Sequence, residues 1–334
     1  MSKIRITWID SVKGIAILLL LFSHSMTSYD WIKNWILAFR IPIFFIICGY
    51  IVHLKYSDGF KHGQFIDLIS KRWYNLFLPY FLFGVLWILF INILRILGDE
   101  SLLFQPLIVK LVSMEGVASL WFLPTYCFSE IFLITILGLF KGLTRYAVIA
   151  LIILTLSLID QSSLSYPFSL VYRIAAGSVF VFIGFIFASY KIEEKLSWKF
   201  ALLLFFVFSF CTIFNNGASM NDMKIVPLYF VNAVIINLSF ISLVRFWGEK
   251  CGNNNYMTYM TFYGKNSLIV ICTNNIIIET IRLIDYILFG GVLRSMGYWG
   301  IFIFFIIITI CEYPVIKLFE GKFNRNYLRG CIKK

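Results

Sequence analysis

The chain has 334 residues, of which 60% are hydrophobic and only 14% are charged. Ordinary globular domains carry about 25% charged residues, so this composition excludes a typical soluble protein. The net charge of +12 does not indicate nucleic-acid binding, because the cations form short clusters between apolar runs. That pattern is typical of loops at an anionic membrane surface. We therefore expect membrane lipids, and no nucleic acid, among the partners.

The first apolar run follows Lys3 and Arg5, as in a signal peptide. No small-residue cleavage site follows it, so we interpret the run as an uncleaved first span. The seven cysteines show neither metal-ligand spacing nor a pairing pattern, which favours a role as small packing residues. We expect no metal and no prosthetic group.

Apolar runs of about 20 residues are long enough for a helix to cross a hydrocarbon core of about 30 Å. The predicted spans, of which the fifth is the shortest, are 12–28, 34–54, 75–97, 119–140, 145–160, 169–190, 198–215, 225–245, 264–284 and 297–317. The segment Leu288–Val292 is predicted to be a loop or a re-entrant piece. The predicted fold is therefore an all-α, polytopic membrane protein with about ten transmembrane helices in a single domain, 1–334.

The positive charges predict the orientation of these spans. If the N-terminus is cytoplasmic, most of the 29 Lys and Arg residues fall in cytoplasmic segments, as the positive-inside rule requires. Both termini are then cytoplasmic. An incorrect number of spans would remove this asymmetry.

The first span contains two ionisable residues, Lys13 and His24. Ionisable groups within a membrane are costly and are therefore candidates for function. Eleven residues make about three helical turns, so the two side chains share a helix face about 16 Å apart. A long substrate threaded between them is one interpretation. The other is a lysine that reaches the interface and a histidine hydrogen-bonded within the bundle, and the spacing leaves both open. Asp10, about 21 Å from His24, is predicted to pair with Lys13 one turn away.

The second and third spans add further candidates. Arg40 lies near Pro42, which breaks the helical hydrogen-bond ladder, and is level with His24. It could hold a substrate oxygen or pair with a carboxylate. Lys71 and Arg72 precede the third span, where cations either bind phosphates or fix topology.

The fourth span provides two candidate substrate-binding residues, Trp121 and Glu130. Trp121 is either an anchor at the membrane interface or one wall of a sugar site.

The order of several short motifs resembles the acyltransferase family 3 membrane proteins, including fucose-4-O-acetylase-like enzymes and O-acetyltransferases of O-antigen, capsule and exopolysaccharide. The motifs are Asp10…Lys13-Gly14-Ile15…His24, Pro42-Ile43-Phe44-Phe45…Gly49-Tyr50, Lys71-Arg72…Leu78-Pro79-Tyr80, Trp121-Phe122-Leu123 and Gly264-Lys265-Asn266-Ser267-Leu268. Each is weak alone, but together they cover most of the chain.

The resemblance implies an O-acetyltransferase of the bacterial inner membrane that takes acetyl from cytoplasmic acetyl-CoA. The acceptor it implies is a hydroxyl of a cell-surface carbohydrate, either lipid-linked or polymeric. It assigns the family's basic-residue and histidine pattern to Lys13 and His24, and CoA binding to Arg72, with Lys71 as a possible substitute. The family's second cation is replaced by Asn75, and many short members have histidine and serine where this chain has Arg40 and Cys48.

The predicted mechanism places the CoA phosphates near Lys13, Lys71 and Arg72, and the thioester beside His24. A neutral imidazole suits a general base at physiological pH, although an acyl-histidine intermediate is the other route. Arg40 would stabilise the oxyanion. The main alternative is a transporter or flippase for a lipid-linked saccharide, with Arg173, Glu279, Arg282 and Glu312 lining a path. A structural membrane partner would leave the alignment of Lys13 with His24 unexplained.

Overall fold

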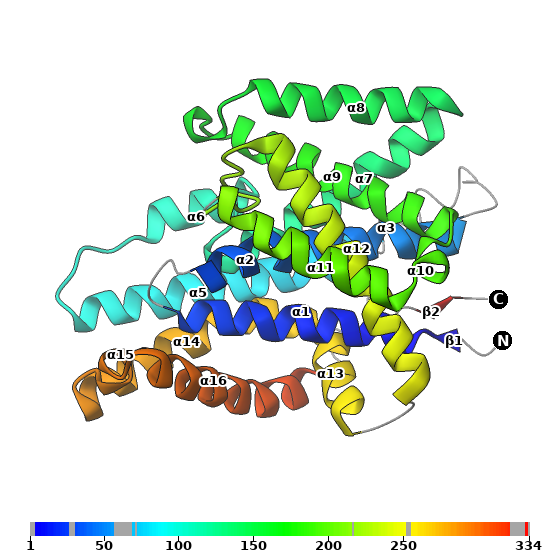
Figure 1. Ribbon diagram of the computed structural model, residues 1–334. Coiled ribbons are helices and arrows are strands. Elements are labelled where there is room, and N and C mark those ends of the chain that lie inside the picture. The colour runs from blue at the N-terminus through cyan, green and yellow to red at the C-terminus, as the bar shows by residue number, and fades with distance from the viewer. Residues whose placement is uncertain are drawn as a thin grey trace.

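The computed structural model describes residues 4–26, 31–56, 69–70, 72–215, 217–251, 255–320 and 331–332. Nearly all of this chain is helical. The two strands in the described part have two residues each, β1 (Ile4–Arg5) and β2 (Cys331–Ile332), and they pair antiparallel. The pairing brings the two ends of the chain to the same end of the molecule (Figure 1). Lys71, a predicted CoA-binding residue, lies outside the described residues.

In the described ranges, nine helical segments are long and apolar enough to cross a membrane. They are α1 (Thr7–Ser25), α2 with α3 (Trp31–Arg40 and Pro42–Tyr56), η1 with α5 (Trp73–Phe77 and Leu78–Leu97), η2 with α7 (Ala118–Trp121 and Phe122–Leu139), α9 (Phe168–Ser189), α11 with η4 (Trp198–Cys211 and Thr212–Asn215), α12 (Val226–Cys251), α14 (Ser267–Phe289) and α16 (Gly297–Phe319). A tenth apolar helix, α8 (Leu143–Leu158), has 16 residues and matches the predicted short fifth span. The protein is an all-α, polytopic membrane protein, as predicted.

Short helices occupy several segments that lie between the predicted spans. They are α6 (Phe104–Val112), η3 (Gln161–Ser163), α10 (Ile192–Lys195), α13 (Asn255–Lys265) and α15 (Val292–Ser295). The predicted loop or re-entrant piece at Leu288–Val292 is a tight turn. There α14 continues to Phe289, and Gly290 and Gly291 then adopt positive φ angles of 62° and 79° before α15 begins. Glycine populates this left-handed region without steric cost.

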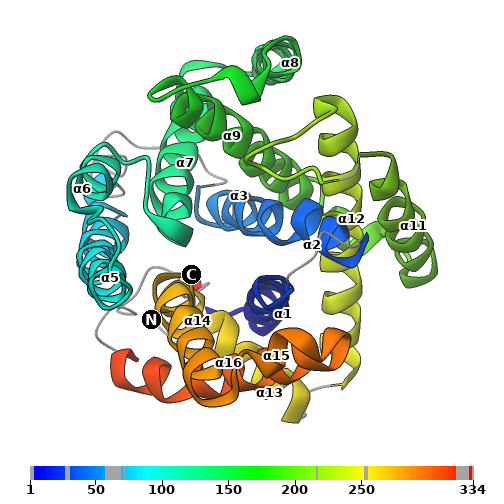
Figure 2. The ribbon, with the colours of Figure 1, turned by 90° about the vertical axis from the view of Figure 1, so that its left-hand side faces the viewer.

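The long helices form a bundle around α1 and α3. Seen along the bundle, α3 lies near the middle with α1 beside it, and α8 and α11 lie at the periphery (Figure 2). The first residues of α1 lie at the end of the molecule where both chain ends are found (Figure 1). The last turn of α1, which carries His24, is at the opposite end. Lys13 and His24, the two candidate residues of the first span, therefore lie towards opposite ends of one central helix.

Glycines allow the central helices to approach closely. A Cβ atom at Gly14 of α1 would lie 1.8 Å from the Met260 carbonyl oxygen of α13, and one at Gly264 would lie 1.7 Å from the Asp10 carbonyl oxygen. Gly49 of α3 is likewise against α9, with a Cβ position 1.7 Å from the Val181 carbonyl oxygen. Small residues are the usual means by which membrane helices bring their backbones together. The predicted close helix contact at Gly49 is confirmed.

The predicted helix break near Pro42 is also confirmed. Helix α2 ends at Arg40, and Pro42 opens α3. Proline lacks the N–H that an interior helical residue donates, but it is tolerated in the first turn, where that donor would have no partner. The break turns Arg40 towards α1, where its guanidinium contacts the last turns of the helix.

Candidate active site

Helix α1 carries the polar residues that define the two ends of the site. Lys13 lies in its second turn and is paired with Asp10 at 3.1 Å, with both side chains buried. The predicted Asp10–Lys13 pair is therefore confirmed. His24 lies in the last turn of the same helix and is half-buried. Helix α1 is continuous from Lys13 to His24, so the predicted shared helix face is retained. Other helices of the bundle pack against both ends of this face.

The imidazole of His24 lines a cavity of about 260 Å³. Its walls come from α1, the α2–α3 break, η2 with the start of α7, and α14. The lining residues are Leu20, His24, Arg40, Ile41, Phe44, Ala118, Ser119, Trp121, Phe122, Ile271 and Asn275. We call this space the histidine chamber. Among the described residues, no side chain or backbone group hydrogen-bonds to the His24 ring; Arg282 donates to the backbone carbonyl oxygen of His24 instead. The second interpretation of His24, a ring hydrogen-bonded within the bundle, is therefore not supported by the described part of the structure.

Arg40 is held against the same turns of α1. Its guanidinium Nη1 donates to the Ser23 hydroxyl and, at 3.5 Å, to the carbonyl oxygen of Leu20. Ser23 itself donates to that carbonyl at 2.8 Å. A cationic side chain is thus fixed beside the residue that precedes His24, and it lines the histidine chamber. The α2–α3 break places it there, because α2 ends at this residue.

Trp121 forms part of the chamber wall, whereas Glu130 does not. Trp121 ends η2 and lines the chamber, and the guanidinium carbon of Arg173 lies 5.3 Å from the centre of its ring. Arg173 also donates to the Glu115 carbonyl oxygen at 3.3 Å. Glu130 lies two turns further along α7 and pairs with Arg72. The two residues predicted together as substrate-binding are therefore separated.

Arg72 and Glu130 form a buried ion pair. Arg72 Nη2 donates to Glu130 Oε1 at 2.6 Å, and the exposed fractions of the two side chains are 5% and 1%. Arg72 was predicted in a loop at the membrane surface, but it precedes η1 and points into the bundle, where Glu130 neutralises it. An ion pair is the usual way in which a charge is accommodated away from water.

A second cavity lies beside this ion pair. It has a volume of about 30 Å³ and is lined by Lys13, Cys48, Arg72 and Tyr126, together with apolar residues of α3, η1, α7 and α14. We call it the inner cavity. It shares three lining residues with the histidine chamber: Phe44, Phe122 and Ile271. The two cavities are thus neighbours, separated by these three side chains, and together they extend from Lys13 to His24.

Helix α14 supplies residues that the sequence analysis did not assign to the site. Ile271 and Asn275 line the histidine chamber, and Glu279 and Arg282 continue along the helix. The spacings of four, four and three residues place all four on one helix face. Arg282 Nη2 donates to the His24 carbonyl oxygen at 3.2 Å. The helical spacing of the polar residues Asn275, Glu279 and Arg282 can be seen in the sequence. Their proximity to His24 cannot, because it depends on the packing of α14 against α1.

The four charged residues proposed to line a transporter path are dispersed. Arg173 packs on Trp121, and Glu279 pairs with Arg282 at 2.6 Å near the end of α14. Glu312 is buried in α16 and accepts a hydrogen bond from Thr273 at 2.9 Å. Of the three cavities described here, the one between α14 and α16 is lined by Glu279 and Arg282, and the other two are lined by none of the four residues.

The bundle thus brings an imidazole and a guanidinium to the lining of one cavity, and ionisable groups within membrane spans are candidates for function. The comparison with protein families agrees: the acyltransferase domain of acyltransferase family 3 matches residues 6–312. The chain therefore belongs to acyltransferase family 3, and it is a multi-pass membrane acyltransferase. Searches of curated proteins and of solved structures found no significant match.

Proposed function

We propose that this protein transfers acetyl from cytoplasmic acetyl-CoA to a hydroxyl of a cell-surface saccharide, at the inner membrane of a bacterium. The observation that carries the proposal is the His24 ring, which faces the histidine chamber without a hydrogen-bond partner among the described residues. The ring is half-buried and lines the chamber, so its nitrogens are open to a substrate there. A neutral imidazole left available in this way suits a general base.

The transfer balances with the groups present. His24 takes the proton of the sugar hydroxyl, and the hydroxyl oxygen forms a bond to the thioester carbonyl carbon. The negative charge that develops on the carbonyl oxygen lies in the chamber that also contains the Arg40 guanidinium, and such preorganised donors stabilise an oxyanion. The carbon–sulfur bond then breaks, and the CoA sulfur receives the proton from the imidazolium.

The donor enters from the Lys13 end in this proposal. Lys13 and Arg72 line the inner cavity, and the ends of the chain lie on that side of the molecule. We place the chain ends and the CoA phosphates on the cytoplasmic side, in accord with the distribution of Lys and Arg residues. Both cations have a carboxylate partner, Arg72 in Glu130 and Lys13 in Asp10, so in this proposal the two ion pairs shape the wall of the passage.

The passage must widen during the reaction. A cavity of about 30 Å³ holds about one water molecule, which is too little for the arm that carries the thioester. Phe44, Phe122 and Ile271 separate the inner cavity from the histidine chamber. Rotation of the two phenylalanine side chains would join the two spaces. Tight closure without donor keeps water away from the thioester site.

Mass spectrometry of the surface glycan tests the proposal. The glycan would be compared between cells with the wild-type gene, a deletion and His24→Ala, with the amount of protein in the membrane measured by immunoblot. We expect an increment of one acetyl group only with the wild-type protein. A glycan of unchanged mass in the deletion strain, or an acetylated glycan in the His24→Ala strain at normal protein level, would refute it.

A further inference from the structure

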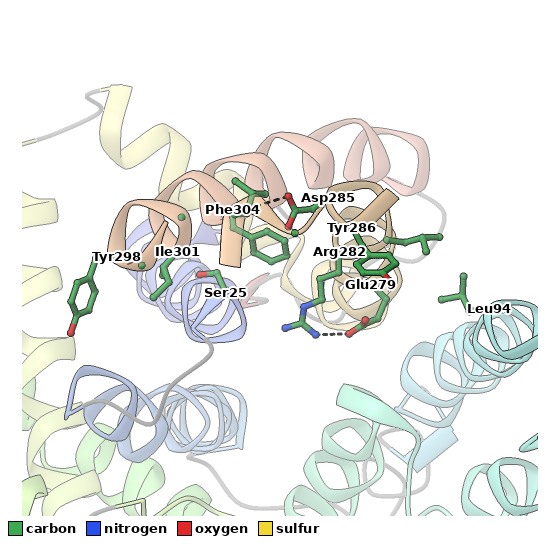
Figure 3. Close-up of a pocket in the computed structure, with 14 residues that line it drawn as sticks. Ser25, Leu94, Glu279, Arg282, Asp285, Tyr286, Tyr298, Ile301 and Phe304 are labelled. Atoms are coloured by element: carbon green, nitrogen blue, oxygen red, sulfur yellow. Dashed lines mark hydrogen bonds and ion pairs between the residues drawn. The ribbon is translucent and has the colours of Figure 1, made fainter. Parts of the chain in front are cut away.

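The largest cavity among those described lies at the His24 end of the molecule. It has a volume of about 530 Å³ and lies between the last turns of α14, α15, the first turns of α16 and the end of α1. Figure 3 shows Glu279 and Arg282 of α14 paired beside Ser25 of α1, with Leu94 of α5 across the opening. We call it the outer pocket. Its volume is within the range of about 300–1,000 Å³ that is typical of sites for small ligands.

The outer pocket and the histidine chamber are lined by neighbouring positions of the same two helices, α14 and α1. On α14, Ile271 and Asn275 line the chamber, and Glu279 and Arg282 line the outer pocket on the same helix face. On α1, His24 lines the chamber and the next residue, Ser25, lines the outer pocket. Arg282 also donates to the His24 carbonyl oxygen at 3.2 Å. The outer pocket therefore lies beside the backbone of His24, at the end of α1 that carries the proposed catalytic base.

The lining of the outer pocket combines aromatic faces with a few polar groups. Tyr286 and Phe304 provide the aromatic surface, and the Arg282 guanidinium carbon lies 6.0 Å from the centre of the Phe304 ring. Glu279 and Arg282 are both about one-third exposed, at 34% and 37%. Aromatic ring faces attract groups that carry a partial positive charge, such as the C–H bonds of a pyranose ring, and the polar pair can exchange hydrogen bonds with hydroxyl groups.

The net charge of the residues that line the outer pocket favours neutral over anionic sugars. Its charged lining residues, within the described part of the chain, are Arg282, Glu279 and Asp285, which sum to one negative charge when all are ionised. Asp285 is buried and accepts a hydrogen bond from the Leu293 backbone N–H at 3.2 Å, which fixes the α14–α15 turn at the rim. A carboxylate or phosphate on the bound sugar ring would be repelled by this excess of negative charge.

We infer that the outer pocket binds the acceptor, and that the acceptor residue is a neutral sugar. The inference rests on the proposed function, since it assigns the second substrate of that reaction. Donor and acceptor then reach His24 from opposite ends of α14, the donor past Ile271 and the acceptor past Arg282. Ser25 and the Glu279–Arg282 pair would hold the hydroxyl-bearing face of the ring towards the chamber.

The test uses the native acceptor in cells and a donor-binding measurement on the purified full-length protein. The variants are Tyr286→Ala and Glu279→Ala, and the matched control is Ile287→Ala. Ile287 has an exposed fraction of 65%, close to the 74% of Tyr286, but it does not line the pocket. The fraction of acylated glycan would be measured by mass spectrometry, and fragmentation would identify the acylated sugar. Titration of each detergent-purified variant with CoA would report the donor site and the integrity of the fold.

We expect both pocket variants to lower the acylated fraction, Glu279→Ala by about 10- to 150-fold, which corresponds to the loss of one hydrogen bond to a charged group. CoA binding should stay at the wild-type level, and Ile287→Ala should match wild type in both readouts. Full acylation by both pocket variants, or acylation on a uronic acid or another anionic sugar, would overturn the inference. The proposed function fails separately, through an unacylated glycan with the wild-type protein or through activity of His24→Ala.

Discussion

The two ends of α1 differ in how the protein treats its polar groups. At the Lys13 end, Lys13 is paired with Asp10 and Arg72 with Glu130, and the cavity between them has about 30 Å³. At the His24 end, the imidazole ring has no hydrogen-bond partner among the described residues, and the adjoining cavities have about 260 and 530 Å³. The first end is built like a stabilised protein interior, and the second keeps the His24 ring and a larger space available.

The difference shows which polar groups serve stability and which are available for chemistry. An ion pair within a membrane offsets the cost of burying each charge, and removing one partner leaves the other uncompensated. A solvated or substrate-facing imidazole makes no such contribution. Variants at the Lys13 end should therefore affect folding, and variants at the His24 end should affect turnover. Four predictions test this division, in order of decreasing effect.

The largest effect is expected for His24→Ala. Loss of a general base lowers the rate by roughly 10²–10⁴-fold, measured as CoA release from acetyl-CoA in the presence of the purified surface glycan. The matched control is His53→Ala, since the His53 ring lies 3.1 Å from the Ser189 hydroxyl and lines none of the three cavities. An equal loss of rate in both variants would indicate a general effect of histidine removal and would contradict a special role for His24.

The next effect is on stability and concerns Glu130→Ala. It leaves the Arg72 guanidinium buried without its carboxylate, which should cost about 3–5 kcal/mol of unfolding free energy. The measurement is thermal or denaturant unfolding of the purified protein in detergent. The control is Glu320→Ala, which removes the partner of Lys317 in an exposed pair and should cost about 0–1 kcal/mol. The double variant Arg72→Met with Glu130→Met should recover part of the lost stability. Equal losses for Glu130→Ala and Glu320→Ala would show that burial of the ion pair is not decisive.

A slightly smaller effect on rate is expected for Arg40→Gln. Removal of one oxyanion-stabilising donor typically lowers kcat by about 10²–10³-fold. The KM for acetyl-CoA should change little, because the donor enters at the opposite end of α1 in the proposed mechanism. Steady-state kinetics on purified protein separates the two constants. A large rise in KM with an unchanged kcat would move Arg40 from oxyanion stabilisation to donor binding.

The smallest effect is expected for Ser23→Ala. This change removes the hydroxyl to which Arg40 donates and leaves the Leu20 carbonyl as its second acceptor. One hydrogen bond is worth about 1.5–3 kcal/mol when a charged group takes part, and the remaining contact should limit the loss in kcat to about tenfold. The control is Ser11→Ala in the same helix, since the Ser11 hydroxyl donates to the Thr7 carbonyl oxygen and lines none of the three cavities. If Ser23→Ala reduced the rate as much as Arg40→Gln, the serine itself would take part in the reaction.

The sequence by itself determined where the membrane-spanning helices lie and which polar residues share a face within one helix. Apolar runs gave the spans, because a helix in lipid must satisfy its own backbone hydrogen bonds and needs about 20 residues to cross. The proline rule located the α2–α3 break, and helical spacing put Lys13 and His24 on one face and paired Asp10 with Lys13. These features depend on local backbone geometry, which is encoded within a few residues.

Only the tertiary structure decided which residues surround His24. Glu130 was grouped with Trp121 because both lie in one span, but side chains nine residues apart on a helix are more than two turns apart, and Glu130 pairs with Arg72 from a different helix. Asn275, Glu279 and Arg282 lie near His24 only because α14 packs beside α1. The two helices are more than 240 residues apart in the sequence. Spacing predicts contacts within one helix, whereas contacts between helices depend on packing that close approach at residues such as Gly14 and Gly264 permits.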